Sequence, residues 1–156
     1  MKNFQSRRTK VFISYCHKDT EWLERLLVHL KPLEREGVIE SWNDTMIKPG
    51  SKWREEIRNA INSAKVAVLL LSADFLASDF IVKNELPPLL TAANKKGTVI
   101  LPVLISPSRF EQIKDLSQFQ GVNPPSNPLI RMTKADQEEL FVKVTKENWK
   151  QMLRPD

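Results

Sequence analysis

The chain has 156 residues, of which 41% are hydrophobic and 28% are charged, and its formal net charge is +5. This length suits one domain with a full hydrophobic core, and charges interleaved with apolar residues argue against intrinsic disorder. The modest positive excess is compatible with an anionic ligand or simply with solubility. It is too diffuse to indicate DNA binding on its own.

The cysteine content and the apolar runs indicate the compartment. Cys16 is the single cysteine, so no disulfide can form within the chain, which fits a reducing environment. Residues 1–10 lack the apolar stretch of a secretory signal, and no apolar run approaches the roughly 18–20 residues that span a bilayer. The sequence therefore predicts a cytoplasmic protein.

Four apolar segments are typical of buried parallel strands, and they occupy residues 10–15, 38–42, 66–72 and 99–106. The third and fourth are nearly continuous in apolar residues, as expected where helices cover both faces of a sheet. Four helices are predicted at residues 19–35, 51–64, 78–94 and 133–152, with Asp19 and Thr133 as N-caps. This alternation predicts an α/β fold with a doubly wound parallel sheet.

Ligands bind such sheets outside the carboxyl ends of the strands. Four segments therefore matter most, namely residues 14–19, 42–53, 72–85 and 106–109. The sequence has neither GxGxxG nor GxxxxGK[ST], which argues against a Rossmann dehydrogenase or a P-loop NTPase. The strand ends lack paired acids, and one cysteine with two scattered histidines makes no structural zinc site. Cys16 and His17 are neighbours whose side chains point apart, so they do not form a nucleophile–base pair.

Two features after the strands carry functional hypotheses. In the loop at residues 43–50, Met46 and Ile47 either contact a partner or fold back onto the following helix, and the sequence favours neither. In the third predicted helix, Glu85 is a carboxylate among apolar residues, followed at once by Pro87 and Pro88. Pattern alone leaves it open whether Glu85 lies in a cleft or is an ordinary solvated glutamate on a kinked helix.

Taken together, the ordered motifs resemble those of a TIR domain, particularly the bacterial kind. KVFISYCHKD is similar to the family's first strand and loop, WNDTMIKPGSKW to its second-strand end and BB loop, VAVLLLSADFLASDFIVKNEL to its third strand and glutamate helix, and VILPVLIS to its fourth strand. The resemblance covers residues 10–154, with residues 1–9 expected to be a flexible N-terminal segment and a sensor domain expected outside this chain. It implies a flavodoxin-like fold with about five strands, the fifth lying between residues 116 and 132, near 129–132.

The resemblance also implies an activity and a site. Many bacterial members cleave NAD+ to nicotinamide and an ADP-ribose product, linear or cyclic, in immune signalling, and others only assemble. Glu85 matches the family's catalytic glutamate, and Ile81 stands where many members have tryptophan. The residues that match positions around the nucleotide are Ser14, Tyr15, His17, Trp42, Asp44, Lys48, Phe75, Ser78 and Asp79.

Chemistry explains how one carboxylate could suffice. Most glycosidases need a second carboxyl group to protonate a poor leaving group. Nicotinamide leaves NAD+ as a neutral molecule, so the reaction needs only stabilisation of positive charge growing on the ribose. We therefore expect Glu85 to act without a metal or a cofactor, NAD+ being the substrate. Self-association through Met46 and Ile47, with Lys48 reaching a neighbour's nucleotide, is expected to activate it.

Two other functions remain open at this stage. A non-catalytic interaction module would use the BB loop and have no need of Glu85. A nucleoside glycosyltransferase would share the fold type and a glutamate, but the TIR-like order of the loops argues against it.

Overall fold

The computed structural model describes residues 8–156, so the predicted flexible segment lies outside the described residues except for Arg8 and Thr9. Strands β1 (Lys10–Ser14), β2 (Glu40–Trp42), β3 (Ala64–Leu71) and β4 (Val99–Leu104) form one parallel sheet in the order β2-β1-β3-β4. All four predicted strands are confirmed. The order reverses between β1 and β3, which is the switch point at which flavodoxin-like sheets place their ligand site.

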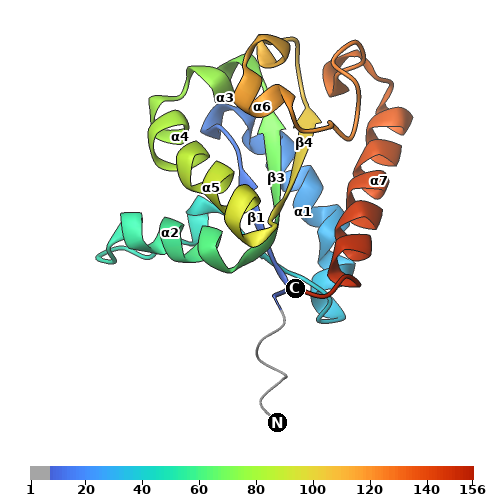
Figure 1. The fold of residues 1–156 in the computed structure, drawn as a ribbon. Coiled ribbons are helices and arrows are strands. Elements are labelled where there is room, and N and C mark those ends of the chain that lie inside the picture. The colour runs from blue at the N-terminus through green and yellow to red at the C-terminus, as the bar shows by residue number, and fades with distance from the viewer. Residues whose placement is uncertain (1–7) are drawn as a thin grey trace.

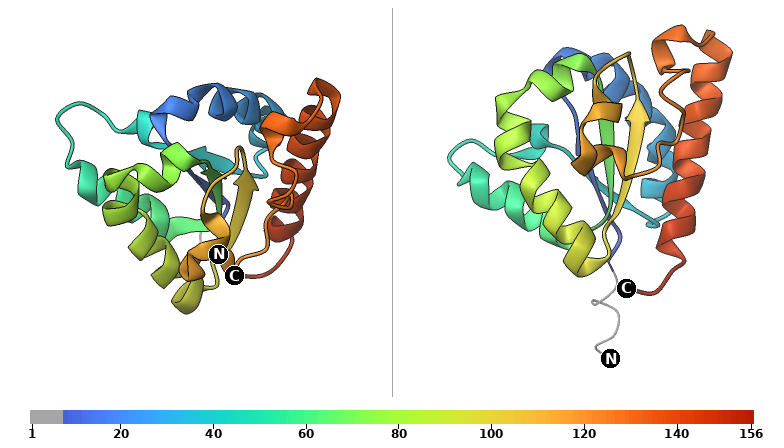
Figure 2. Two further views of the ribbon diagram at one scale, coloured as in Figure 1. Left: turned by 90° about the horizontal axis from the view of Figure 1, so that it is seen from above. Right: turned by 45° about the horizontal axis from the view of Figure 1, so that its top comes forward.

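Helices cover both faces of this sheet, as Figures 1 and 2 show. The helices α1 (Thr20–Arg35) and α7 (Lys134–Met152) lie on one face. The opposite face carries α2 (Trp53–Ser63), α3 (Ala73–Ala77), α4 (Asp79–Asn84) and α5 (Leu86–Lys96), and the short α6 (Lys114–Ser117) follows β4. Short 3₁₀ turns occupy His17–Asp19, Asp44–Met46, Phe110–Gln112 and Leu129–Arg131. Among the described residues, no helix is both long and apolar enough to cross a membrane.

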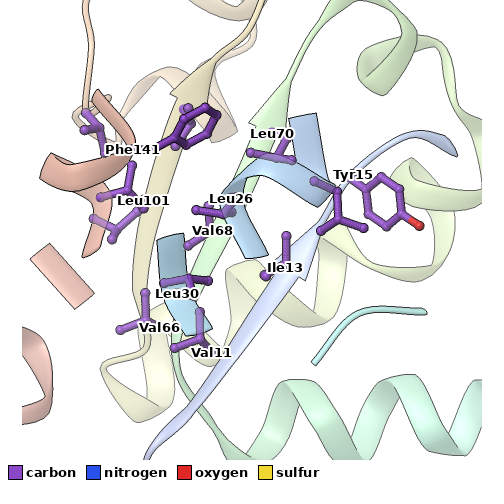
Figure 3. Packing of buried hydrophobic residues seen from close by; sticks show 14 of the residues in the cluster. Val11, Ile13, Tyr15, Leu26, Leu30, Val66, Val68, Leu70, Leu101 and Phe141 are labelled. Atoms are coloured by element: carbon purple, nitrogen blue, oxygen red, sulfur yellow. The ribbon is translucent and has the colours of Figure 1, made fainter. Parts of the chain in front are cut away.

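Alternation along the strands divides the core into two clusters. Val11 and Ile13 of β1, and Tyr15 just after it, face α1 and α7 and belong to one cluster with Leu26 and Phe141 (Figure 3). The intervening Phe12 faces the α2 side and joins a second cluster with residues of α2 and α5. Every residue of β3 is buried, because β3 lies between β1 and β4 and has helices over both of its faces.

The expected fifth strand near residues 129–132 is wrong for the described chain, because Leu129–Arg131 forms a 3₁₀ turn. In place of a fifth strand, separate side-chain and backbone hydrogen bonds cover the free edge of β4. The Asn123 side chain accepts from the Leu104 N–H and donates to the Leu104 carbonyl, both at 2.9 Å. The backbone N–H of Val122 bonds to Pro102 and that of Ile130 to Ile105. Three prolines lie between residues 124 and 128, and a residue without an N–H cannot extend a ladder.

The helix boundaries follow the predictions with two differences. Thr133 caps α7, its hydroxyl accepting from the Asp136 N–H. Asp19 precedes α1, but its carboxylate makes no capping bond and instead accepts a 2.5 Å hydrogen bond from Ser72, at the end of β3. The single helix predicted at residues 78–94 is divided at Glu85 into α4 and α5.

Candidate active site

Glu85 occupies the junction between α4 and α5, next to the carboxyl end of β1. Its side chain accepts a 2.6 Å hydrogen bond from the hydroxyl of Ser14, the last residue of β1. Ser14 lies on the α2 side of the sheet because it alternates with Ile13, and so it faces the helices that carry the glutamate. Both residues are buried, and Glu85 is only 3% exposed.

The two prolines after Glu85 explain the junction. Pro87 and Pro88 fall in the first turn of α5, where backbone N–H groups need no partner within the helix. The Glu85 N–H still bonds to Ile81 in α4, and its carbonyl accepts from Leu89 in α5. The glutamate is therefore held by backbone bonds from both helices, and the prolines begin a new helix rather than kinking one.

Burial gives this carboxyl group an unusual proton affinity. Removal from water is the largest cause that raises the pKa of Glu85, and the nearby Asp44 carboxylate also raises it. The hydrogen bond from Ser14 and the nearby His17 lower the pKa, and the resulting value is about 7 against a usual 4.5. Near neutral pH both the protonated and the ionised form of this carboxyl group are therefore populated, as is common for catalytic carboxyl groups.

A cleft of about 320 Å³ lies over this region, lined by Tyr15, Cys16, His17, Lys18, Asp44, Ser78, Phe80 and Ile81. Two of the lining residues contact each other: Nε2 of His17 lies 2.8 Å from Oδ2 of Asp44. Burial and the Asp44 carboxylate raise the pKa of the Tyr15 phenol well above its usual value, so the ring keeps its hydroxyl proton. Glu85 is not among the lining residues, but its carboxyl group is close enough to Asp44, which lines the cleft, for that carboxylate to raise its pKa.

A protein-family model described as "TIR domain" matches residues 11–139, which is most of the chain. The chain belongs to the TIR domain family. An uncharacterized protein of Sinorhizobium fredii, y4lF, is 29% identical over 136 residues, which are 87% of this chain and 41% of that protein. The TIR domains of the activated Roq1 resistosome, a structure described as directly recognizing the pathogen effector XopQ, superpose with a TM-score of 0.56 and 20% identity. That match covers 93% of this chain and 97% of the other.

This TIR domain gathers only part of the predicted nucleotide-binding set around its cleft. Tyr15, His17, Asp44 and Ser78 line the cleft, and Ser14 reaches Glu85 from below it. The roles of these residues stay predictions.

The other four predicted residues lie elsewhere. Trp42 is buried and stacks on Phe12 at 5.2 Å, and Phe75 is buried in the same core cluster. Lys48 and Asp79 are exposed and do not line the cleft. Trp42 and Phe75 thus support the site from the core, while any nucleotide contact by Lys48 would extend beyond this cleft.

The two apolar residues of the loop at residues 43–50 behave differently: one is exposed, as a partner contact requires, and the other folds back onto the domain. Met46 is 47% exposed, whereas Ile47 is half-buried and packs against the core cluster beneath α2. Only Met46 is therefore presented to a partner in this conformation of the TIR domain.

Sequence reasoning missed two features of the site. Phe80 lines the cleft with 38% of its surface exposed, and a large apolar residue one position before Ile81 was the available signal. The buried bond between Asp19 and Ser72 joins the loop after β1 to the end of β3, and no sequence pattern indicates it. Within residues 8–156, no group of three metal-ligating side chains is placed to hold a metal ion.

Proposed function

We propose that this TIR domain is an NAD+ glycohydrolase in which Glu85 is the catalytic residue. The supporting observation is a buried carboxyl group that accepts a hydrogen bond from Ser14 at the switch point of the sheet, near a cleft whose lining includes Tyr15, Phe80 and Ile81. The cleft is of the size expected for part of a nucleotide rather than a whole dinucleotide.

The substrate's own charge suits a carboxyl group with a raised pKa. The pyridinium ring of NAD+ is a cation, and an adjacent cation favours the ionised form of a carboxyl group. Substrate binding would therefore drive the Glu85 proton off and leave a carboxylate beside the ribose, in a site from which water is excluded.

The reaction then proceeds by cleavage of the bond between C1′ of the ribose and the ring nitrogen, whose electron pair leaves with nicotinamide. The ionised Glu85 stabilises the oxocarbenium charge that grows on the ribose. Water adds to C1′ and loses a proton, giving ADP-ribose, or an internal nucleophile of the substrate adds and gives a cyclic product. No general acid is required, because nicotinamide departs as a neutral molecule.

Self-assembly is part of the proposal. Glu85 is only 3% exposed, and the His17–Asp44 contact forms part of the wall of the adjacent cleft. A neighbouring copy contacting Met46 would displace the loop that carries Asp44 and open a path to the carboxyl group. A role in bacterial immune signalling is part of the proposal and is supported only by membership of the family.

The alternative is a TIR interaction module without catalysis. The occlusion of Glu85 favours it, because a carboxyl group that never meets a substrate would still join the α4–α5 junction to β1 through the Ser14 hydrogen bond. In that case Met46 and its loop would be the functional surface.

One experiment separates the two functions. Concentrated protein, its Glu85→Gln variant and the control Glu36→Gln, at an exposed position away from the cleft, are incubated with NAD+ and the products are resolved by chromatography. We expect nicotinamide from the parent and the control but not from Glu85→Gln. Equal release by all three would rule out the role of Glu85, and no release from assembled protein would favour the interaction module.

The dependence on assembly is tested with the same assay. Turnover per chain should rise with protein concentration in step with the appearance of larger species on a sizing column. Full turnover by dilute, monomeric protein would contradict activation by assembly.

A further inference from the structure

A second, smaller cavity lies between α2 and the junction of α4 and α5. It has a volume of about 150 Å³, and its charged lining residues are Arg54, Arg58 and Lys83. Asn84, the residue before Glu85, lines it as well. Three cations thus converge beside the helix junction that carries the catalytic candidate, and no acidic residue is among those that line the cavity.

These three cations lack anionic partners. Within residues 8–156, none of their side chains makes a hydrogen bond or an ion pair with a protein group. The nearest acid along α2, Glu55, is paired with Lys52 at 3.9 Å. Glu55 lies three residues before Arg58 on α2, but no ion pair or hydrogen bond joins the two side chains, and Glu55 does not line the cavity.

An aromatic pair connects this cavity to the cleft near Glu85. Trp53 lines the basic cavity, Phe80 lines the cleft, and their ring centroids are 5.4 Å apart. The Arg54 guanidinium lies 4.8 Å from the centre of the Trp53 ring, which holds it at the rim of the cavity. Both rings are more than one-third exposed, so a planar group can lie on them.

We propose that the basic cavity binds the phosphate groups of the nucleotide substrate, with its base stacked on Trp53 and Phe80. The choice of a nucleotide as the ligand rests on the proposed NAD+ cleavage, whereas the cluster of three cations is a feature of the structure itself. Guanidinium groups match phosphate oxygens in a two-pronged geometry, and a cavity of this size takes a phosphoryl group but no base. The chain would thus hold the diphosphate with its own α2 and α4, rather than through Lys48 of a neighbouring copy.

The test measures binding of ADP, which carries the phosphates and base without the reacting bond. Calorimetric titrations at low salt compare the parent with the double variant Arg54→Gln/Arg58→Gln and the matched control Arg35→Gln, whose arginine is exposed at the end of α1. We expect the double variant to bind ADP at least about tenfold more weakly, since each charge-assisted bond is worth a tenfold change or more. The control should bind as the parent does.

Further arms identify the ligand's contacts. Trp53→Leu should weaken binding of ADP but leave binding of inorganic pyrophosphate unchanged, because only ADP has a base to stack. Circular dichroism confirms that each variant is folded. The proposal is overturned if the parent fails to bind ADP at millimolar concentration, or if the double variant binds it as tightly as the parent.

Failure of this inference can be told apart from failure of the proposed function. If NAD+ is cleaved with dependence on Glu85 but the KM of the double variant equals that of the parent, the phosphate site is wrong and the activity stands. If no variant cleaves NAD+ yet ADP binding still depends on Arg54 and Arg58, the phosphate site stands and the glycohydrolase proposal falls.

Discussion

Replacing Glu85 with glutamine should stabilise this TIR domain in a way that depends on pH. The folded-state pKa of Glu85 is about 7 against a usual value of 4.5. Below pH 4.5 the group is protonated in both the folded and the unfolded chain, so its titration contributes nothing. As the pH rises toward 7, the unfolded chain loses the proton first, and the folded chain is increasingly destabilised relative to it.

The magnitude follows from the two pKa values. Their difference of about 2.5 corresponds to about 3 kcal/mol, at about 1.4 kcal/mol for each pKa unit. Glutamine has nearly the same shape and does not ionise, and its carbonyl oxygen can still accept the Ser14 hydrogen bond. The variant should therefore equal the parent near pH 4.5 and exceed it by up to about 3 kcal/mol above pH 7.5.

Urea denaturation of both proteins between pH 4.5 and 8.5 measures this difference. Subtracting the two unfolding free energies removes the contributions of other titrating groups, which both proteins share. Asp79→Asn, at an exposed carboxylate in α4, serves as the control and should show no such trend. A difference between Glu85→Gln and the parent that does not change with pH would refute the reasoning that the Glu85 carboxyl is buried with a raised pKa.

Three further predictions test particular contacts. The proposed mechanism requires an ionised Glu85, whose pKa is about 7, so kcat/KM for NAD+ should rise through that pH. Ser14→Ala should move the midpoint upward, since the Ser14 bond lowers the pKa, and an unmoved midpoint would contradict this. Asn123→Ala should lower the unfolding free energy by about 2–4 kcal/mol, because it leaves the buried N–H and carbonyl of Leu104 without partners. Urea denaturation measures this loss, and a loss well below about 2 kcal/mol would contradict the prediction. Phe141→Ala should cost about 3–5 kcal/mol in the same assay, because this ring of α7 is buried against Trp22 and His29 of α1. A loss under about 1 kcal/mol would show that the site collapses.

Most of the fold could be predicted from the periodic spacing of apolar residues in the sequence. The strands and long helices were predictable because their apolar spacing is set by a single buried face or by burial on both faces. The segment after β4 was not predictable, because its order comes from single contacts such as the Asn123 bonds to Leu104. A side chain that imitates a strand's hydrogen bonds leaves no periodic trace in the sequence.

The candidate site was predictable where neighbours in sequence are neighbours in space. Tyr15 and His17 follow β1, so their place at the cleft follows from topology. Trp42 also ends a strand, but its ring turns to Phe12 in the core, and strand position alone cannot decide between those two directions. The pairing of Ser14 with Glu85 joins residues 71 positions apart and required the packed structure.

The covering of the β4 edge also bears on how copies of this domain can meet. Asn123 and the backbone N–H of Val122 bond to the outward backbone groups of Leu104 and the carbonyl of Pro102, and β2 at the other edge offers only three residues. An incoming strand would find few free backbone groups near the end of β4, which disfavours a continuous intermolecular sheet. Contacts between copies of this TIR domain are therefore expected to use helix and loop surfaces, whose side-chain contacts are individually weak and can form and break reversibly.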